Sequence, residues 1–175
     1  MEKKCLYFFA LILILAGCAT SVTKDIIVGA EADPKIDYKD YSSYTWLGSA
    51  SIIYDPDGKW EPPQFDADAQ IKLLIDRELR ARGMSEDSAN PDMIVAFAAG
   101  VDMDSMGIDI PPESNLVALK GLPLGTLVVI LIDAKSKSAI WGGTASAEIQ
   151  QNPSQETIKK RLDFAVTQMF KKLPK

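Results

Sequence analysis

The strongest structural signal in this chain is Gly125-Thr126-Leu127-Val128-Val129-Ile130-Leu131-Ile132-Asp133. It is a nearly continuous apolar, β-branched run bounded by glycine and aspartate, which predicts a strand buried on both faces. Met93–Ala99 has the same character and follows the turn residues Asn90-Pro91. A third strand is predicted over Ala139–Ile149, joined to the first by the short antiparallel hairpin Lys135–Ser138. Within it, the pair Gly142-Gly143 indicates a bulge or a close approach of the backbone.

Two amphipathic helices accompany these strands. Asp66–Arg82 carries apolar residues on one face, with Asp66 placed to cap its start and Gly83 to stop it. The second helix is expected to open at Asn152-Pro153, a cap followed by proline at the first helical position, with Gln155 completing a capping box. Its apolar stripe continues to Phe170, and Pro174 ends it.

Two shorter strands are predicted upstream, over Ile26–Val28 and Ser42–Leu47. The element order is therefore β-β-α-β-β-β-α. This order predicts an α+β fold, an antiparallel β-sheet with two amphipathic helices packed on one face. Residues 25–175 are expected to form one domain, because about 150 residues is an ordinary domain size.

The N-terminal segment is expected to be an address and not part of the fold. Lys3 and Lys4 precede the apolar run Leu6–Leu15, which is shorter than the roughly 20 residues that a membrane-spanning helix needs. Leu15-Ala16-Gly17-Cys18 then reads as a lipobox. We expect residues 1–17 to be a lipoprotein signal peptide, Cys18 to be acylated with palmitate-like chains, and residues 18–24 to form a tether.

This reading places the protein in the cell envelope, with its membrane contact made through the N-terminal lipid. In bacterial lipoproteins an aspartate after the acylated cysteine favours the inner membrane. Ala19 stands there in this chain. We therefore expect an outer-membrane lipoprotein that faces the periplasm.

Composition excludes several classes of function. Histidine is absent, Cys5 is removed with the signal and Cys18 is acylated, so the usual catalytic dyads and triads and the soft metal ligands are missing. We predict no cofactor and no enzyme activity. The formal charge of -5, with scattered lysines and arginines, makes nucleic acid an unsuitable partner.

In its ordered set of segments the chain resembles a family of bacterial lipoproteins catalogued as domain of unknown function 4136. The segments that carry the resemblance, after the lipobox, are Tyr41–Trp46, Leu79–Gly83, Asn90–Val95, Gly125–Asp133, Ile140–Ala145 and the C-terminal helix closing on Phe170 and Leu173-Pro174. The resemblance implies no established activity. Family members often carry a basic residue directly after the hairpin tryptophan, but Gly142 stands there in this chain, so a role for that charge does not transfer.

The segment Val101–Gly125 contains two candidate sites. Asp102, Asp104, Gly107 and Glu113 fall at EF-hand positions, yet Met106 occupies a ligand position and Pro111-Pro112 stands where the second helix should begin. A solvated acidic loop is the better interpretation, and a calcium site with Asp102, Asp104 and Asp109 outside that frame is the alternative.

The same segment is also unusually apolar. It either covers the second face of the sheet or contacts a partner, a lipid or a ligand through side chains that include Met103, Met106 and Ile108. Trp60, in a proline-rich loop, is a second candidate for a partner contact. Tyr44, Trp46 and Trp141 are expected in the core, with a ligand groove as the alternative.

These observations favour a non-catalytic binding or structural module in the periplasm, whose partner is an envelope protein. The alternative is a carrier or sensor of a small apolar ligand held between the sheet and Val101–Gly125. A hydrolase that uses two carboxylates comes third, because acidic residues are plentiful but nothing selects a pair.

Overall fold

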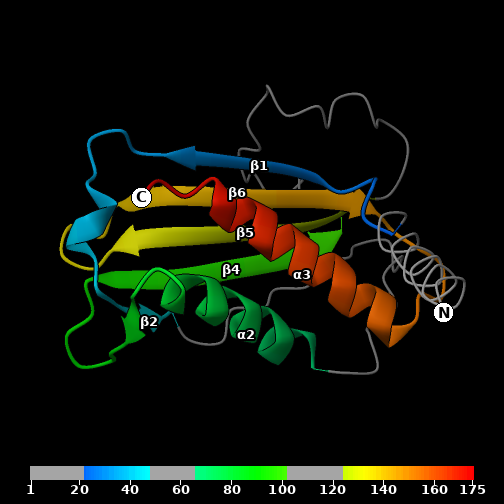
Figure 1. Ribbon diagram of the computed structural model, residues 1–175, viewed down its shortest axis with the longest axis horizontal. Helices are drawn as coiled ribbons and strands as arrows, with labels where there is room; N and C mark the ends of the chain where they lie inside the picture. The colour runs from blue at the N-terminus through cyan, green and yellow to red at the C-terminus, as the bar shows by residue number, and fades with distance from the viewer. Residues whose placement is uncertain (1–21, 48–65, 102–123) are drawn as a thin grey trace, which may run out of the picture.

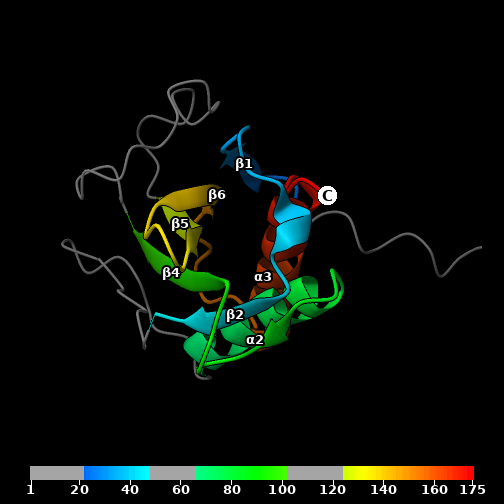
Figure 2. The same ribbon diagram turned by 90° about the vertical axis from the view of Figure 1, so that its left-hand side faces the viewer.

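A six-stranded sheet with two helices on one face forms the body of the molecule (Figures 1 and 2). The computed structural model describes residues 22–47, 66–101 and 124–175. The strand order is β1-β6-β5-β4-β2-β3. The described residues include no helix with the length and apolar character needed to cross a membrane. The predicted α+β class and the placement of both helices on one face are confirmed.

The strands lie close to where the sequence predicts them. Their bounds are β1 Ile27–Ala32, β2 Ser43–Trp46, β4 Met93–Val101, β5 Leu124–Asp133 and β6 Ala139–Glu148. The sequence pattern missed the two-residue β3, Ser85–Glu86, and the short 3-10 helix η2, Tyr38–Asp40, because neither is long enough to show a period.

The sheet is antiparallel over β1, β6, β5 and β4, but β2 runs parallel to both β4 and β3. The prediction of an antiparallel sheet is therefore correct for its larger part only. The helix between β2 and β4 explains the difference: it carries the chain back to its starting end, so the next strand runs in the same direction.

The hairpin between β5 and β6 is held by Asp133, whose carboxylate accepts the Ser136 amide at 2.5 Å and the Tyr41 hydroxyl at 2.9 Å. These hydrogen bonds lower the pKa of Asp133 to about 2, with the Ser136 amide as the main cause. The irregularity in the strand pairing lies between Leu131 and Ile132, and not at the glycine pair. Gly143 instead marks a close approach, since a Cβ there would clash with the Trp141 ring and lie 3.1 Å from the Met169 sulfur.

Helix α2, Ala67–Arg80, begins as predicted: the Asp66 side chain accepts the Ala69 amide at 2.9 Å. Gly83 has φ +83°, which suits the residue that follows a helix end. Helix α3, Gln155–Lys171, begins later than predicted. Its cap is Ser154, which accepts the Thr157 amide at 3.1 Å, while Asn152 has a φ of 49° and belongs to the preceding turn.

The core lies between the sheet and the two helices. Along β4, Met93, Val95 and Phe97 are buried against the helices, and the residues between them are only half-buried. In β5, Thr126, Leu127, Val128 and Val129 are all buried, as a two-sided strand requires. Burial on both faces is therefore right for the first half of β5 and wrong for β4.

Candidate functional site

A pocket of about 460 Å³ lies between the sheet and the first half of α3. We call it the α3 pocket. Its lining residues lie where β6 ends and α3 begins. Figure 1 shows this end of the sheet. Its lining residues come from the chain before β1, from β4, β5 and β6, and from α3. They are Ile26, Ala99, Gly100, Gly125–Leu127, Ala145, Ala147–Pro153, Ile158, Arg161, Leu162 and Ala165.

The α3 pocket exists because small residues stand where the core elsewhere has large ones. The floor is built from Ala99, Gly125, Ala145 and Ala147 on the three central strands. Toward the other end of the same helix, Trp141 and Phe170 fill the space, with ring centroids 5.2 Å apart. Aliphatic side chains, including Ile158 and Leu162, make up most of the exposed wall, so the pocket is mostly apolar.

Arg161 is the most strongly connected polar residue of the α3 pocket. It makes a two-pronged ion pair with Asp25, at 2.8 and 2.6 Å, and donates to the backbone oxygens of Val22 at 2.5 Å and Glu148 at 3.3 Å. Only 12% of the Arg161 side chain is exposed. The hydrogen bond from Arg161 lowers the pKa of Asp25. We call these contacts the Arg161 clamp, because they fasten the start of the described chain to β6 and α3.

The other pocket-lining polar groups are uncharged, except for Glu148. Gln150, Gln151 and Asn152 form the segment between β6 and α3. The Thr126 hydroxyl is hydrogen-bonded to Ser146 at 3.0 Å on the other face of the sheet, away from Leu127 and Ala145. The pocket thus combines apolar walls with a few hydrogen-bonding groups, which is the usual composition of a small-molecule site.

A second hollow, of about 420 Å³, lies on the opposite face of the sheet, over β1, β5 and β6. Glu31, Gly142 and Thr144 are among its lining residues. A Cβ at Gly142 would meet nothing within 4 Å, so a basic side chain would fit at this position. No helix among the described residues covers this hollow, whereas the α3 pocket is enclosed by the sheet on one side and by α3 on the other.

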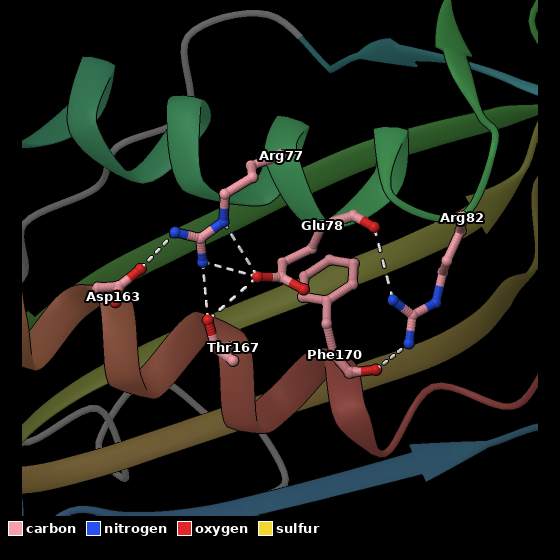
Figure 3. A network of polar contacts seen from close by, with 6 residues as sticks. All are labelled: Arg77, Glu78, Arg82, Asp163, Thr167 and Phe170. Atoms are coloured by element: carbon pink, nitrogen blue, oxygen red, sulfur yellow. Dashed lines mark hydrogen bonds and ion pairs between the residues drawn. The ribbon is translucent and has the colours of Figure 1, made fainter.

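Polar contacts also gather between α2 and α3, but they join the helices. Figure 3 shows Arg77 reaching both Asp163 and Thr167 on α3, with Thr167 2.7 Å away. Arg82 donates to the Phe170 backbone oxygen, and its guanidinium lies 5.8 Å from the Phe170 ring. Burial lowers the pKa of Arg82, and the hydrogen bond that Arg77 donates to Asp163 raises the pKa of Arg77. Each charge is used in packing one helix against the other.

The residues singled out from the sequence lie mostly outside the described ranges. These are Cys18, Trp60, Met103, Met106 and Ile108, together with the calcium candidates Asp102, Asp104, Asp109 and Glu113. Within residues 22–47, 66–101 and 124–175, no three side chains of the His, Cys, Asp and Glu types come together as a metal site would require.

The three aromatic residues that the sequence assigns to the core or to a ligand groove, Tyr44, Trp46 and Trp141, all lie within the described ranges. Tyr44 and Trp141 are buried in the core, and Trp46 packs edge-on against Phe97 with centroids 6.1 Å apart. The core interpretation is right for Tyr44 and Trp141, and Trp46 packs against the core while partly buried. None of the three lines the α3 pocket, but Trp141 also borders the second hollow.

The α3 pocket is not among the sites that the sequence predicts. The alternative with a small apolar ligand places it between the sheet and Val101–Gly125, most of which lies outside the described residues. Two signals were present: Ala145 and Ala147 put small side chains on the helix-facing side of a strand, and Arg161 places a charge beside the apolar stripe of α3. Neither identifies a cavity until the strand and the helix are placed against each other.

The comparisons with known proteins agree on the family and fold. The model of a family described as a domain of unknown function, DUF4136, matches residues 28–175. A solved DUF4136 family protein from Bacteroides thetaiotaomicron is similar with a TM-score of 0.60 and 10% identity, over 85% of this chain and 95% of that chain. A search of curated proteins finds no match.

A PDZ domain protein from Parabacteroides distasonis is similar with a TM-score of 0.54 and 15% identity. The match covers 86% of this chain but 36% of that one, so this chain spans about a third of the longer protein. At these identities the structural likeness shows the fold alone. The family match extends over most of the chain, which therefore belongs to the DUF4136 family.

Proposed function

We propose that this member of the DUF4136 family is a non-catalytic binding protein of the cell envelope, anchored through an acylated Cys18, whose ligand is a small, largely apolar molecule held in the α3 pocket. The lipobox Leu15–Cys18 supports the anchor, and Ala19 supports the outer membrane as its location. The observation that carries the binding function is the unfilled, mostly apolar volume of about 460 Å³ under α3.

The size and walls of the pocket favour a ligand of ordinary metabolite or lipid-fragment size. Binding sites for such molecules enclose roughly 300–1,000 Å³ and combine apolar walls with a few polar groups that fix orientation. The α3 pocket falls in this range, and its amide side chains supply the polar groups. Filling the pocket removes apolar surface from water, which contributes about 25 cal/mol for each Å² of ligand and wall that becomes buried.

The chemistry of the pocket favours binding over catalysis. Glu148 is the only carboxylate among the described residues that line it. A glycoside hydrolase needs two carboxyl groups flanking the scissile bond. The nearby Asp25 is engaged by Arg161 and by the Glu148 amide, at 3.2 Å. The described residues of the pocket can therefore enclose and orient a ligand, but they do not include the two carboxyl groups that an acid–base mechanism needs.

Native mass spectrometry of the protein extracted gently from its own membranes tests both parts of the proposal. We expect a mass that corresponds to cleavage before Cys18 plus acylation, and a further small-molecule mass. An unmodified, uncleaved chain would rule out the anchor.

The small-molecule mass should be lost in Ala147→Phe, which fills the pocket. It should be retained in Ala98→Phe, a matched control, because neighbouring residues on a strand point to opposite faces and Ala99 faces the pocket. A bare wild-type protein, or equal loss in both variants, would rule out the pocket as the binding site.

A further inference from the structure

We infer that the ligand of the α3 pocket is an acyl chain, and that the Arg161 clamp holds this pocket close to the membrane from which the chain is drawn. The inference rests on the proposed function and deepens it. The α3 pocket is the binding site, and the clamp fixes the position of this site relative to the lipid anchor.

The first step is the position of the clamp. Ile26 lines the pocket, and Arg161, which also lines it, holds Val22 and Asp25 just upstream. The start of the described chain is thereby fixed beside the pocket, and it does not leave the domain at a distant point. The fixing is specific, because one guanidinium binds both oxygens of a carboxylate and two backbone oxygens.

The second step is the reach from the clamp to the anchor. Cys18 lies four residues before Val22. Four residues span at most about 14 Å even when fully extended. An acylated Cys18 therefore confines Val22, where the clamp begins, to within about 14 Å of the bilayer surface. The pocket-lining Ile26 and Arg161 lie next to Val22 and are held close to the membrane with it. A pocket at the far end of the sheet would be free of this constraint.

The third step is the chemistry of the lining. Ile158, Leu162 and Ala165 follow one another along α3 and give the pocket a wall that extends about 10 Å along the helix axis. The positive charge of Arg161 is neutralised by Asp25, and Gln150, Gln151 and Asn152 are uncharged. Glu148, which is exposed, adds one carboxylate to this rim. A long aliphatic wall with such a rim suits an alkyl chain ending in an ester or amide better than it suits an anionic metabolite.

Two sources supply an acyl chain near the pocket: a phospholipid of the membrane and the protein's own lipid on Cys18. The experiment distinguishes these two sources. The mature, lipidated protein is reconstituted into vesicles of phosphatidylethanolamine and phosphatidylglycerol that contain a phospholipid with a photoreactive diazirine on its acyl chain. Irradiation followed by peptide mass mapping locates the attachment sites. In a parallel sample the diazirine fatty acid is fed to the producing cells, so that the protein's own lipid carries the probe.

We expect attachment to peptides that line the α3 pocket, from the vesicle probe if a membrane lipid enters and from the fed probe alone if the Cys18 lipid does. Attachment should be lost in Ala147→Phe and retained in Ala98→Phe. Asp25→Asn, which leaves every pocket-lining residue in place, should lower the yield from the vesicle probe by weakening the clamp.

Absence of pocket attachment from both probes would overturn the inference. The proposed function fails separately: a small-molecule mass that is lost in Ala147→Phe, together with no attachment, would retain the binding function and reject the acyl chain. Equal attachment in wild type and Ala147→Phe would also reject the acyl chain as the pocket ligand.

Discussion

The two halves of α3 pack differently against the same sheet. Its C-terminal half buries Val166, Met169 and Phe170 completely, and Phe170 packs against Trp141. Its N-terminal half places Ile158 and Leu162 over alanine and glycine and leaves about 460 Å³ unfilled. Both halves belong to one continuous helix with an apolar stripe, so helix periodicity does not explain the difference.

The difference lies in the strands beneath the helix. Beneath the C-terminal half, Trp141 of β6 fills the space, and Gly143 is small because that indole and Met169 already occupy the room. Beneath the N-terminal half, Ala145 and Ala147 of the same strand are small, and the side chains of the described residues leave the space unfilled. One half of α3 stabilises the fold, and the other half forms a site.

The largest difference between the halves should appear on truncation of their large side chains. Phe170→Ala is expected to lower the free energy of unfolding by about 3–5 kcal/mol, the usual cost of removing a buried aromatic ring. Leu162→Ala should cost about 1 kcal/mol, because the half-buried leucine borders a cavity and makes fewer contacts. Urea unfolding measures both, and equal costs would contradict the division of the helix.

The neighbouring glycines of β6 give a smaller, better matched contrast. Gly143→Ala is expected to lower the free energy of unfolding by about 1–3 kcal/mol, because its new methyl group would push against Trp141 and Met169. Gly142→Ala points to open space and should stay within about 0.5 kcal/mol of wild type. Thermal unfolding of the two variants checks this, and a costly Gly142→Ala would mean that the faces are assigned wrongly.

The Arg161 clamp should make a pH-dependent contribution at the pocket end. The folded-state pKa of Asp25 is lowered by Arg161, so its stabilisation is present above the unfolded pKa of about 3.9 and is lost as the pH falls through the folded value. Asp25→Asn should therefore be less stable than wild type at pH 6. The gap should narrow below pH 4, as measured by urea midpoints, and a gap independent of pH would contradict this role.

The smallest effect is expected where α2 and α3 meet at the surface. Arg77 is 48% exposed and pairs with Asp163, which is 50% exposed, so Arg77→Ala should cost no more than about 1 kcal/mol. The loss should shrink further in high salt, because salt screens exposed charges. Urea unfolding at two salt concentrations is the measurement, and a large, salt-independent loss would show that the ion pair is shielded from solvent.

Much of the fold could be predicted because periodicity is local. The apolar run in β5 and the stripes of α2 and α3 identify their elements without knowledge of their neighbours. The parallel placement of β2 was missed because strand direction depends on the route of the intervening chain. The start of α3 was misplaced because Asn152 and Ser154 are both good caps, and only the backbone turn at Asn152 separates them.

The candidate site was harder to predict, because a cavity belongs to no single segment. Ala147 is separated in sequence from Ala99 and lies near Arg161 only because α3 folds back onto β6. The lipobox is the opposite case, a contiguous signal that can be read without a fold, and the acylation of Cys18 stays a prediction.

Ligand protection of an introduced thiol tests most directly the claim that the unfilled half of α3 is a binding site. Ala147→Cys places a thiol in the α3 pocket, and Ala98→Cys places one on the opposite face. With the lipidated protein in nanodiscs, alkylation by a maleimide is timed with and without the neutral apolar compound N-phenyl-1-naphthylamine. The compound is expected to slow alkylation of the introduced thiol in Ala147→Cys and to leave the rate in Ala98→Cys unchanged. Equal rates with and without the compound in Ala147→Cys, or equal slowing in both variants, would show that this half of α3 is not a binding site.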